Sequence, residues 1–289
     1  MGIKILAIGD FHGELSDRLL NRVKKENFDI IISPGDFCGN SLLAKLIFRY
    51  YKSIENLVDK IGKKKYLDLE RKSFDSGVKI LKILNSLNKP VFLIRGNWDP
   101  SYFQDIGYNN KKDPAAKRFK NKINKLKNVE LIDFKKINYS SYDFIGYPTS
   151  SYPGLVNKNI GKKLINRYGK KGNRLYKKCI KDNKKYFSLF KKLFKESKNP
   201  IFISHNCPYN TKLDLIKKGP QKGKHYGSWL AKEVILKLKP RLVICGHMHE
   251  NPGIIHIGKS IVVNPGSTID NRASIIDIDD RKVKVKFLK

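Results

Sequence analysis

The 289-residue chain is long enough for one large domain or two small ones, and its 40% hydrophobic residues predict a sizeable buried core. Sixty Lys and Arg against 26 Asp and Glu give a formal net charge of +34. This charge either indicates a polyanionic partner, such as nucleic acid, a nucleotide or a phosphorylated surface, or reflects an A/T-rich coding bias. No apolar run approaches the roughly 20 residues that span a bilayer, which argues against a membrane helix or a membrane partner.

Five short runs rich in Ile and Val, each followed by a polar turn, are the clearest regularity along the chain. Runs of this length that are apolar on both faces predict strands buried in the middle of a layered domain. They occupy residues 3–10, 30–36, 91–97, 201–205 and 242–247.

Polar, patterned segments between these runs predict helices, and Pro90, Pro200 and Pro240 each end a helix just before a strand begins. The expected helices cover residues 14–27, 41–60, 66–88, 172–198 and 226–239. After the last buried run, Gly, Pro and Asp-Asp turns separate short segments that predict antiparallel strands. These strands are expected at residues 253–257, 260–264, 273–278 and 282–288.

Two basic stretches that also contain aromatic residues are expected to be helical additions to the core, at about 41–75 and 154–198. Charge runs of this kind are commonly solvated helix faces. The alternative is a nucleic-acid surface, on which Lys and Arg neutralise phosphates and aromatic rings stack on bases. The chain has no internal repeat, so we expect a single domain over residues 1–289 with these two insertions.

The four cysteines form no C-x-x-C pair, and a disulfide framework is not expected in a chain this long and this poor in Cys. The N-terminus lacks a basic region followed by a small-residue cleavage site, so no signal peptide is predicted. Both features favour a cytoplasmic location.

Residues able to bind a metal stand at or just after the end of each of the five predicted buried strands. Strand C-termini in layered α/β domains converge on one edge, where loops present side chains to a common crevice. Carboxylate, amide and imidazole groups suit Mn, Fe, Co or Zn and require no thiolate. The candidates include four of the six histidines of the chain. They are Asp10, His12, Asp36, Asn97, His205, His247 and His249.

In this order the candidates resemble the calcineurin-like metallophosphoesterase superfamily. The motifs are D-x-H at 10–12, G-D at 35–36, G-N-x-D at 96–99, the His at 205 and G-H-x-H at 246–249. The stretches 204–214, 225–228, 245–253 and 262–267 are similar to a prokaryotic subgroup that has GNWD in place of GNH[DE]. The resemblance covers about residues 3–278 and implies an α/β fold with mixed sheets, a four-layer αββα sandwich.

The resemblance also implies a site for two divalent metal ions, with Mn preferred over Fe, Zn, Co and Ni. Asp10, His12 and His249 would hold one ion, and Asn97, His205 and His247 the other. Asp36 would bridge them, because a carboxylate has two oxygens. The implied reaction is the attack of a metal-bound hydroxide on a phosphate ester, with both ions neutralising charge on the phosphoryl oxygens.

Trp98 stands where many members of the superfamily have a histidine that is thought to protonate the leaving group. An indole N–H donates a hydrogen bond but delivers no proton near neutral pH. One reading is an enzyme that favours phosphodiesters or other substrates with good leaving groups, with Trp98 as a candidate for substrate binding. In a second reading His225 supplies the proton, although a lone histidine in a loop is more often structural.

The sequence therefore predicts a metal-dependent phosphoesterase, with a phosphodiester favoured over a monoester as its substrate. A nuclease or nucleic-acid-binding protein of the same fold is one alternative, motivated by the charge. A catalytically weak binding scaffold is another, although all seven candidate ligands are present.

Overall fold

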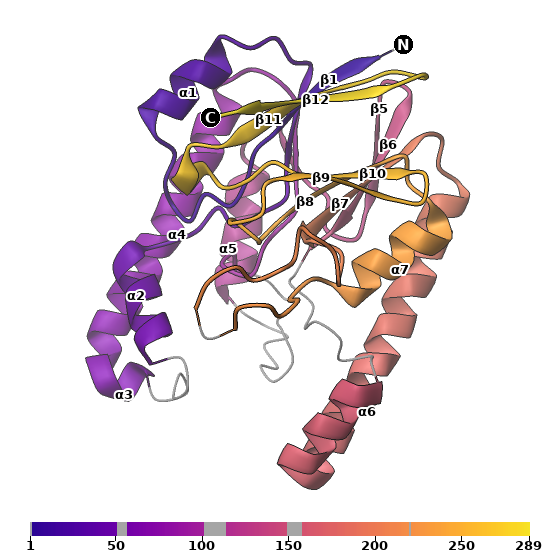
Figure 1. Ribbon diagram of the computed structural model, residues 1–289. Helices are drawn as coiled ribbons and strands as arrows, with labels where there is room; N and C mark the ends of the chain where they lie inside the picture. Colours follow the sequence, from indigo (N-terminus) through magenta and orange to yellow (C-terminus); the bar gives the residue numbers. More distant parts are fainter. Residues whose placement is uncertain (1, 51–56, 101–113, 149–157, 220) are drawn as a thin grey trace.

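Two six-stranded sheets lie face to face in the middle of the molecule (Figure 1). The computed structural model describes residues 2–50, 57–100, 114–148, 158–219 and 221–289. The strands of the first sheet, in order across it, are β12 (Val283–Leu288), β11 (Ala273–Ile278), β1 (Ile3–Ala7), β2 (Ile30–Ser33), β3 (Val91–Leu93) and β4 (Val129–Leu131). Those of the second are β5 (Lys136–Tyr139), β6 (Tyr142–Tyr147), β7 (Pro200–Asn206), β8 (Leu242–Gly246), β10 (Ser260–Asn264) and β9 (Gly253–Ile257).

Both sheets are mixed, with a parallel centre and antiparallel flanks. In the first sheet β1 to β4 are parallel, and β11 and β12 extend it antiparallel. In the second sheet β6, β7, β8 and β10 are parallel, and β5 and β9 are the antiparallel edges. Asp36 follows β2 and His205 lies near the end of β7, and these side chains approach within 3.5 Å. The parallel strands of both sheets therefore end at one common edge.

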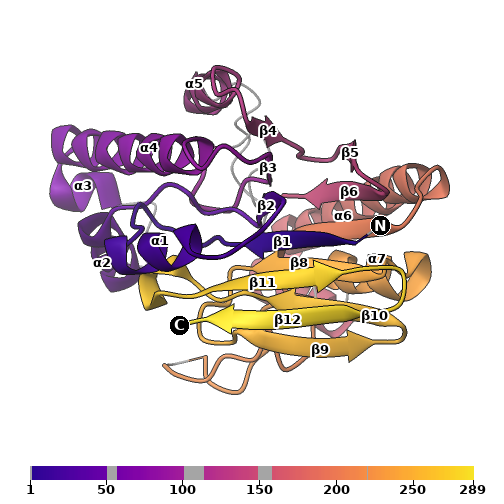
Figure 2. The same cartoon turned by 90° about the horizontal axis from the view of Figure 1, so that it is seen from above.

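Helices cover the outer faces of both sheets, so the molecule has four layers (Figure 2). α1, α4 and α5 pack on the first sheet through residues such as Leu19, Leu81 and Phe119. α6 and α7 pack on the second sheet through Phe190 and Val234. The helices are α1 (Asp17–Lys24), α2 (Ser41–Arg49), α3 (Leu57–Ile61), α4 (Lys63–Asn85), α5 (Pro114–Ile123), α6 (Lys158–Lys195) and α7 (Trp229–Leu238).

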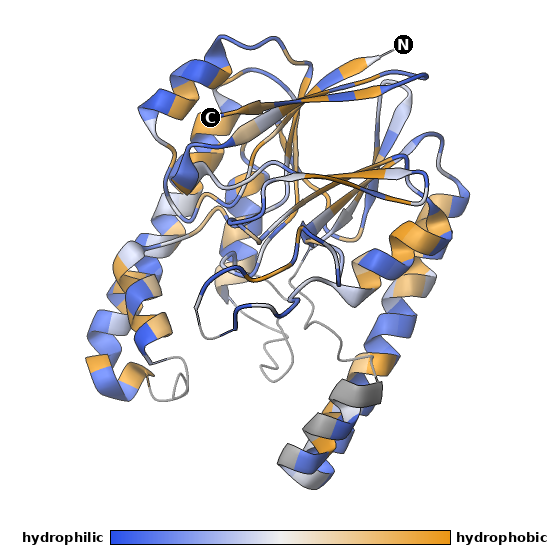
Figure 3. Ribbon diagram, in the orientation of Figure 1, coloured by the Kyte–Doolittle hydropathy of each residue, from blue (hydrophilic) through white to orange (hydrophobic). Residues whose placement is uncertain are grey.

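A core shared by both sheets lies between them, where Ile5, Ile32, Phe144, Ile203 and Ile244 are fully buried. Each central strand also has its other face under helices, which explains why the strand sequences are apolar at successive positions. Figure 3 shows the hydrophobic colour concentrated along the strands and on the inward faces of the helices. Full burial of one such side chain contributes about 1.5–3 kcal/mol.

The predicted four-layer αββα sandwich with mixed sheets is confirmed. All five predicted buried strands and all four predicted C-terminal strands are present, with boundaries that differ by a few residues. Three strands and one helix were not predicted: β4, β5, β6 and α5. β6 is fully buried, but Asp143 and Gly146 interrupt its apolar pattern. The Asp143 carboxylate is satisfied by the backbone N–H of Lys198 at 2.7 Å, which makes its burial tolerable.

Two predicted helices were wrong in extent. The one expected at 41–60 is two helices, α2 and α3, and residues 51–56 between them lie outside the described ranges. The one expected at 172–198 begins earlier, at Lys158, and bends at Gly169, whose φ of 51° and ψ of −130° are not helical. No helix in the described part of the chain combines the length and apolarity that crossing a membrane requires.

Candidate metal centre

The structure gathers the predicted ligand side chains at the common edge of the two sheets. Two groups of side chains each have ligand atoms within 4.8 Å of one another, and Asp36 belongs to both. One group is Asp10, His12, Asp36 and His249, and the other is Asp36, His205 and His247. The seventh candidate, Asn97, joins the second group, because its Oδ1 lies 2.9 Å from Nε2 of His205. Metal ligation by these seven residues stays a prediction.

The backbone turns sharply where the strands deliver these side chains. Asp10, His12, Asp36 and His247 all have positive φ, at 52°, 45°, 57° and 68°. Residues other than Gly adopt this region at a cost of about 1–3 kcal/mol, and such strain gathers at functional sites. The surrounding hydrogen bonds hold the conformations, for example the 2.8 Å bond from the backbone N–H of His247 to Oδ2 of Asp10.

Gly96 is the closest backbone neighbour of the shared carboxylate. A Cβ atom on Gly96 would lie 2.1 Å from Oδ1 of Asp36 and 2.6 Å from Cε1 of His205. Both distances are much shorter than van der Waals contact. Asp36 and His205 are buried and closely packed, so neither side chain can move away.

We expect Gly96→Ala to displace Asp36 and weaken metal binding by about tenfold to a hundredfold, the range for residues that hold ligands in place. Isothermal titration with Mn²⁺ measures this loss. Gly258→Ala is the control, because a Cβ there meets nothing within 4 Å, and its positive φ makes it the more strained substitution of the two for the backbone. Equal affinity for Mn²⁺ in Gly96→Ala and Gly258→Ala would contradict the close approach of Gly96 to the Asp36 carboxylate.

Asp36 occupies the centre of the site. Its Oδ2 lies 3.4 Å from Nε2 of His12 and 3.5 Å from Nε2 of His205, so it faces one imidazole of each group. Its Oδ1 accepts a hydrogen bond from the backbone N–H of Trp98 at 2.8 Å, which fixes the rotation of the carboxylate. One oxygen is thus held by the protein, and the other points between the two groups.

The donor set fits divalent cations. Oδ1 of Asp10 and Oδ2 of Asp36 are buried and have no hydrogen-bond partner in the described part of the chain. Burial of an unpaired carboxylate oxygen is costly, and coordination of a cation compensates for it. Nε2 of His12 and Nε2 of His249 face each other at 3.0 Å, as two ligands of one ion would. Oxygen and imidazole donors without thiolate suit Mn, Fe, Co or Zn.

Burial and the neighbouring charges shift the pKa values of the candidate ligands. Burial raises the pKa of Asp36 to about 7, and burial and the neighbouring Asp36 charge raise the pKa of Asp10 well above its usual value. Burial and the nearby imidazoles lower the pKa of His12 to about 2, and burial lowers that of His205 to about 4. Burial also lowers the pKa of His247. The imidazoles are therefore neutral and ready to ligate, whereas Asp36 retains part of its proton at neutral pH.

These pKa values predict how metal affinity depends on pH. Asp36 must lose its proton to ligate through Oδ2, so binding at about pH 6 should release at least about one proton from the carboxylates. Apparent affinity should fall by at least about tenfold for each pH unit below 7, because the proton on Asp10 must also be released, and the histidines should contribute nothing. Calorimetric titration in buffers of different ionisation enthalpy counts the protons. Proton release that is constant from about pH 6 to pH 8.5 would contradict the role of Asp36.

Asp99 organises the loops that carry the ligands, a role that the sequence analysis did not assign. Its buried carboxylate accepts four backbone N–H groups: those of Asp36, Phe37, Cys38 and Gly96, at 2.8 to 2.9 Å. It thereby ties the loop after β2 to the loop after β3. The signal was present in the sequence as the final Asp of the G-N-x-D motif, but only the fold shows what this side chain holds.

The turn after β10 also supports the site. Oγ of Ser267 donates to the backbone oxygen of Asp10 at 2.7 Å. Nδ2 of Asn264 donates to the carbonyl oxygens of Met248 and Asn251, at 2.9 and 3.0 Å. The turn therefore holds the loop that carries His247 and His249.

Trp98 lies at the rim of the centre. Its ring stands edge-on to the imidazole of His12, with 5.4 Å between centroids. It also packs against the apolar cluster that α2, α3 and α4 build around Leu43, Leu57 and Leu69. The ring therefore connects the candidate metal centre to these helices.

His225, the candidate proton donor, lies outside both ligand groups. Its Nδ1 is 2.8 Å from Oδ1 of Asp214, a fully buried carboxylate. A carboxylate accepts, so Nδ1 carries a hydrogen and Nε2 is directed away from Asp214. The loop is tied to the centre, because Asn206, the neighbour of His205, donates from Nδ2 to the carbonyl oxygen of Tyr226 at 3.0 Å.

Comparisons with known proteins show which fold and which family the chain shares. A 92-residue stretch, 30% of the chain, is 35% identical to the uncharacterized protein MJ1162 of Methanocaldococcus jannaschii and covers 41% of that protein. TT1561 of Thermus thermophilus has a similar fold, with a TM-score of 0.57 and 15% identity over the whole of both chains. Another crystal structure aligns over the whole of both chains with a TM-score of 0.63 and 18% identity. Residues 3–251 match the calcineurin-like phosphoesterase family, and the chain belongs to that family.

Proposed function

We propose that this chain is a phosphodiesterase that uses two divalent ions, with Mn preferred, held by the seven residues at the sheet edge. The observation that carries the proposal is the buried Oδ2 of Asp36, which faces an imidazole of each group and has no hydrogen-bond donor among the described residues. When bound, two such ions polarise a phosphoryl oxygen and lower the pKa of a water molecule.

The protein's own residues hold the ligand groups in position. Asp36 and Asp10 offer anionic oxygens that neutral ligands would not, and Asp99 fixes the two loops between which a phosphate group would enter. Trp98 replaces the histidine of GNH[DE], and we place the chain in the subgroup with this variant. Because an indole delivers no proton, a substrate with a poor leaving group requires a proton donor other than Trp98.

We expect the protein with Mn²⁺ to hydrolyse bis-p-nitrophenyl phosphate faster than p-nitrophenyl phosphate, which shares its leaving group but carries an additional negative charge. Removal of metal by a chelator should abolish both activities, and added Mn²⁺ should restore them. The release of p-nitrophenol measures the rates. Turnover that survives chelation, or none with any divalent ion, would exclude the proposed function and favour a binding scaffold.

A nuclease, or a nucleic-acid-binding protein of the same fold, remains the second candidate function. The net charge of +34 favours it. A catalytically weak scaffold is the third, and the complete set of candidate ligands speaks against it. All four cysteines are free and buried, which supports our placement of the protein in a reducing cytoplasm.

We further propose that His225 delivers a proton to the leaving oxygen. Besides His225, Asp214 accepts the backbone N–H groups of Asn210, Thr211 and Gly227, so the carboxylate that orients the ring is itself immobile. The imidazole side chain is 27% exposed, which leaves Nε2 accessible to a substrate. This arrangement resembles the pairing of a general acid–base histidine with an orienting carboxylate.

His225→Gln tests this role through the leaving group. We expect a loss of about 10²-fold or more for a diester with an alkoxide leaving group, and little loss for p-nitrophenolate, which needs no proton. His256→Gln on β9 is the control. Of the six histidines, His256 is the one that belongs to neither ligand group and is not paired with Asp214. Equal losses on both leaving groups would assign His225 a structural role instead.

A further inference from the structure

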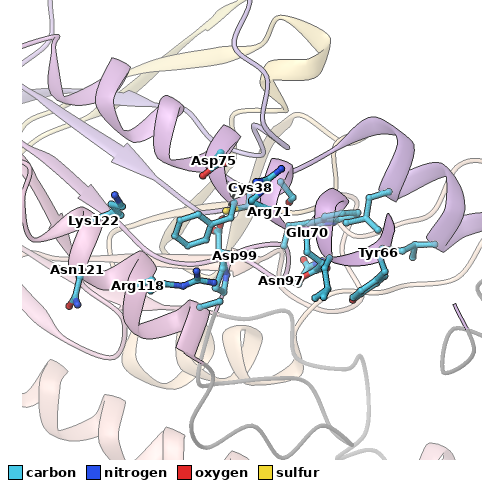
Figure 4. Close-up of a pocket in the computed structure, with 18 of the residues that line it drawn as sticks. Cys38, Tyr66, Glu70, Arg71, Asp75, Asn97, Asp99, Arg118, Asn121 and Lys122 are labelled. Carbon is cyan, nitrogen blue, oxygen red and sulfur yellow. Dashed lines mark hydrogen bonds between the residues drawn. The ribbon is translucent and has the colours of Figure 1, made fainter. Parts of the chain in front are cut away.

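A pocket of about 1210 Å³ opens beside the candidate metal centre and continues away from it between helices. Asn97 and His247 line its inner end, Trp98 forms part of its wall, and α2, α4 and α5 supply the remainder. In Figure 4 Arg118 and Lys122 of α5 lie on one side and Tyr66 and Glu70 of α4 on the other, with Asn97 and Asp99 between them. The pocket is larger than a single phosphate group requires.

One side of this pocket is basic. Arg118 and Lys122 are one helical turn apart on α5 and therefore face the same way, and Lys125, just beyond the end of α5, lines the same pocket. The opposite face of α5 is buried, with Phe119 and Ile123 in the core. None of the three cations forms an ion pair within the ranges that the structure describes. Unpaired cations along a groove are suited to successive phosphates.

The other side of the pocket is aromatic and apolar. Trp98, Tyr66 and Phe48 line it, and the Phe48 side chain is 75% exposed. An exposed ring at the lip of a pocket is a usual feature of a surface that binds a ligand. Flat rings opposite cations provide stacking for bases and neutralisation for phosphates, the two contacts that bind single-stranded nucleic acid.

Two exposed acids, Glu70 and Asp75, also line the pocket, and they help to choose among anionic ligands. Carboxylates repel a surface that is uniformly anionic, such as that of a vesicle, but they accept hydrogen bonds from exocyclic amino groups of bases. The cations still outnumber them, because Arg71, Arg118, Lys122 and Lys125 line the same pocket.

We propose that this groove binds a single-stranded oligonucleotide and leads one of its phosphodiester bonds to Asn97 and His247. Phosphates contact Arg118, Lys122 and Lys125, and bases stack on the rings of the opposite wall. The inference rests on the proposed phosphodiesterase function, for which it names the substrate class. It places the specificity in α2, α4 and α5 rather than in the metal ligands.

The test compares two charge-reversed double variants of the full chain. Arg118→Glu with Lys122→Glu alters the groove, and Lys191→Glu with Lys192→Glu makes the same change in charge on the exposed face of α6. The ratio of kcat/KM for a ten-nucleotide oligodeoxycytidylate, whose bases carry exocyclic amino groups, to that for bis-p-nitrophenyl phosphate is measured for both. Binding of the fluorescein-labelled oligonucleotide is measured by anisotropy with chelator present, so that it does not depend on hydrolysis.

We expect the groove variant to lower the kcat/KM ratio by about tenfold or more, and the α6 variant to leave it unchanged. The slope of log affinity against log salt should fall by about 1.4 in the groove variant, since each contact to a single-strand phosphate contributes about 0.7. Equal effects of the two variants, or tighter binding to phosphatidylglycerol vesicles than to the oligonucleotide, would overturn the proposal. Binding that depends on the groove without hydrolysis of either substrate would support the groove and reject the phosphodiesterase.

Discussion

We expect Asp36→Asn to lose both metal ions and about a thousandfold or more in kcat/KM for bis-p-nitrophenyl phosphate. Asn keeps the size of the side chain and still accepts the backbone N–H of Trp98 through its oxygen. The atom that faces His12 and His205 becomes an amide nitrogen, which offers no lone pair to a cation. Metal ions contribute several kcal/mol to stabilisation of a phosphoryl transition state, and about 4 kcal/mol corresponds to a thousandfold in rate.

The same substitution should stabilise the metal-free protein, an effect that a damaged fold would not produce. The pKa of Asp36 is raised from 3.8 to about 7, so its carboxylate destabilises the metal-free folded state above pH 7, and this penalty fades as pH falls toward 3.8. Metal-free Asp36→Asn should therefore unfold at a higher temperature than the metal-free wild type at pH 8. The difference between the two free energies of unfolding approaches about 4 kcal/mol, since a shift of one pKa unit corresponds to about 1.36 kcal/mol.

Metal content by atomic emission and thermal unfolding with and without chelator measure both effects. Asp59→Asn, on the exposed α3, is the matched control and should bind metal as the wild type does. Wild-type metal content and turnover in Asp36→Asn would show that Asp36 is not a shared ligand.

The sequence predicted the sheet edge well because the local signals there are strong. Buried parallel strands are continuous apolar runs, and each run ends where the chain must turn, so strand ends and the polar residues after them are readable together. The backbone at Asp10 and Asp36 lies in a conformation that short polar side chains tolerate, which is also a local property. The motifs therefore marked where the five strands end, and they predicted the candidate ligands that follow them.

Features that depend on distant contacts were not readable. β6 contains Asp143 and Gly146, and the buried Asp143 carboxylate accepts hydrogen bonds from Nδ2 of Asn138 and from the backbone N–H of Lys198, which comes from a distant part of the chain. The orientation of His225 depends on Asp214, which is eleven residues away and is held by three backbone N–H groups of its loop. The groove beside Trp98 requires three helices to meet, one of which, α5, was not predicted at all.

Asp99 shows this difference most clearly, and its replacement should have the largest effect on stability of any single change at the site. The GNWD motif marks the residue, but its four backbone N–H partners come from two loops. Three of these partners are more than 60 residues away from Asp99 in the sequence. In Asp99→Ala these four buried N–H groups lose their acceptor. Each unsatisfied buried donor costs about 1–3 kcal/mol, so we expect a loss of at least about 4 kcal/mol in the free energy of unfolding. The loss applies at about pH 5, because burial and the charge of Asp36 raise the pKa of Asp99 to about 7 and the ionised carboxylate carries a penalty above that pH.

Chemical denaturation of the metal-free protein measures this loss without interference from metal binding. The matched control is Asp68→Ala, because Asp68 is paired with Arg71 and Lys72 on the exposed face of α4, where solvent screens such pairs and they contribute little to stability. The stability of Asp99→Asn should fall between those of Asp99→Ala and Asp68→Ala. Its amide oxygen still accepts from the N–H groups of Phe37 and Cys38, whereas its amide nitrogen faces the N–H groups of Asp36 and Gly96. If Asp99→Ala were no less stable than Asp68→Ala, the loops would be held by packing alone. The positive φ at Asp36 would then need another source of support than the carboxylate that receives its N–H.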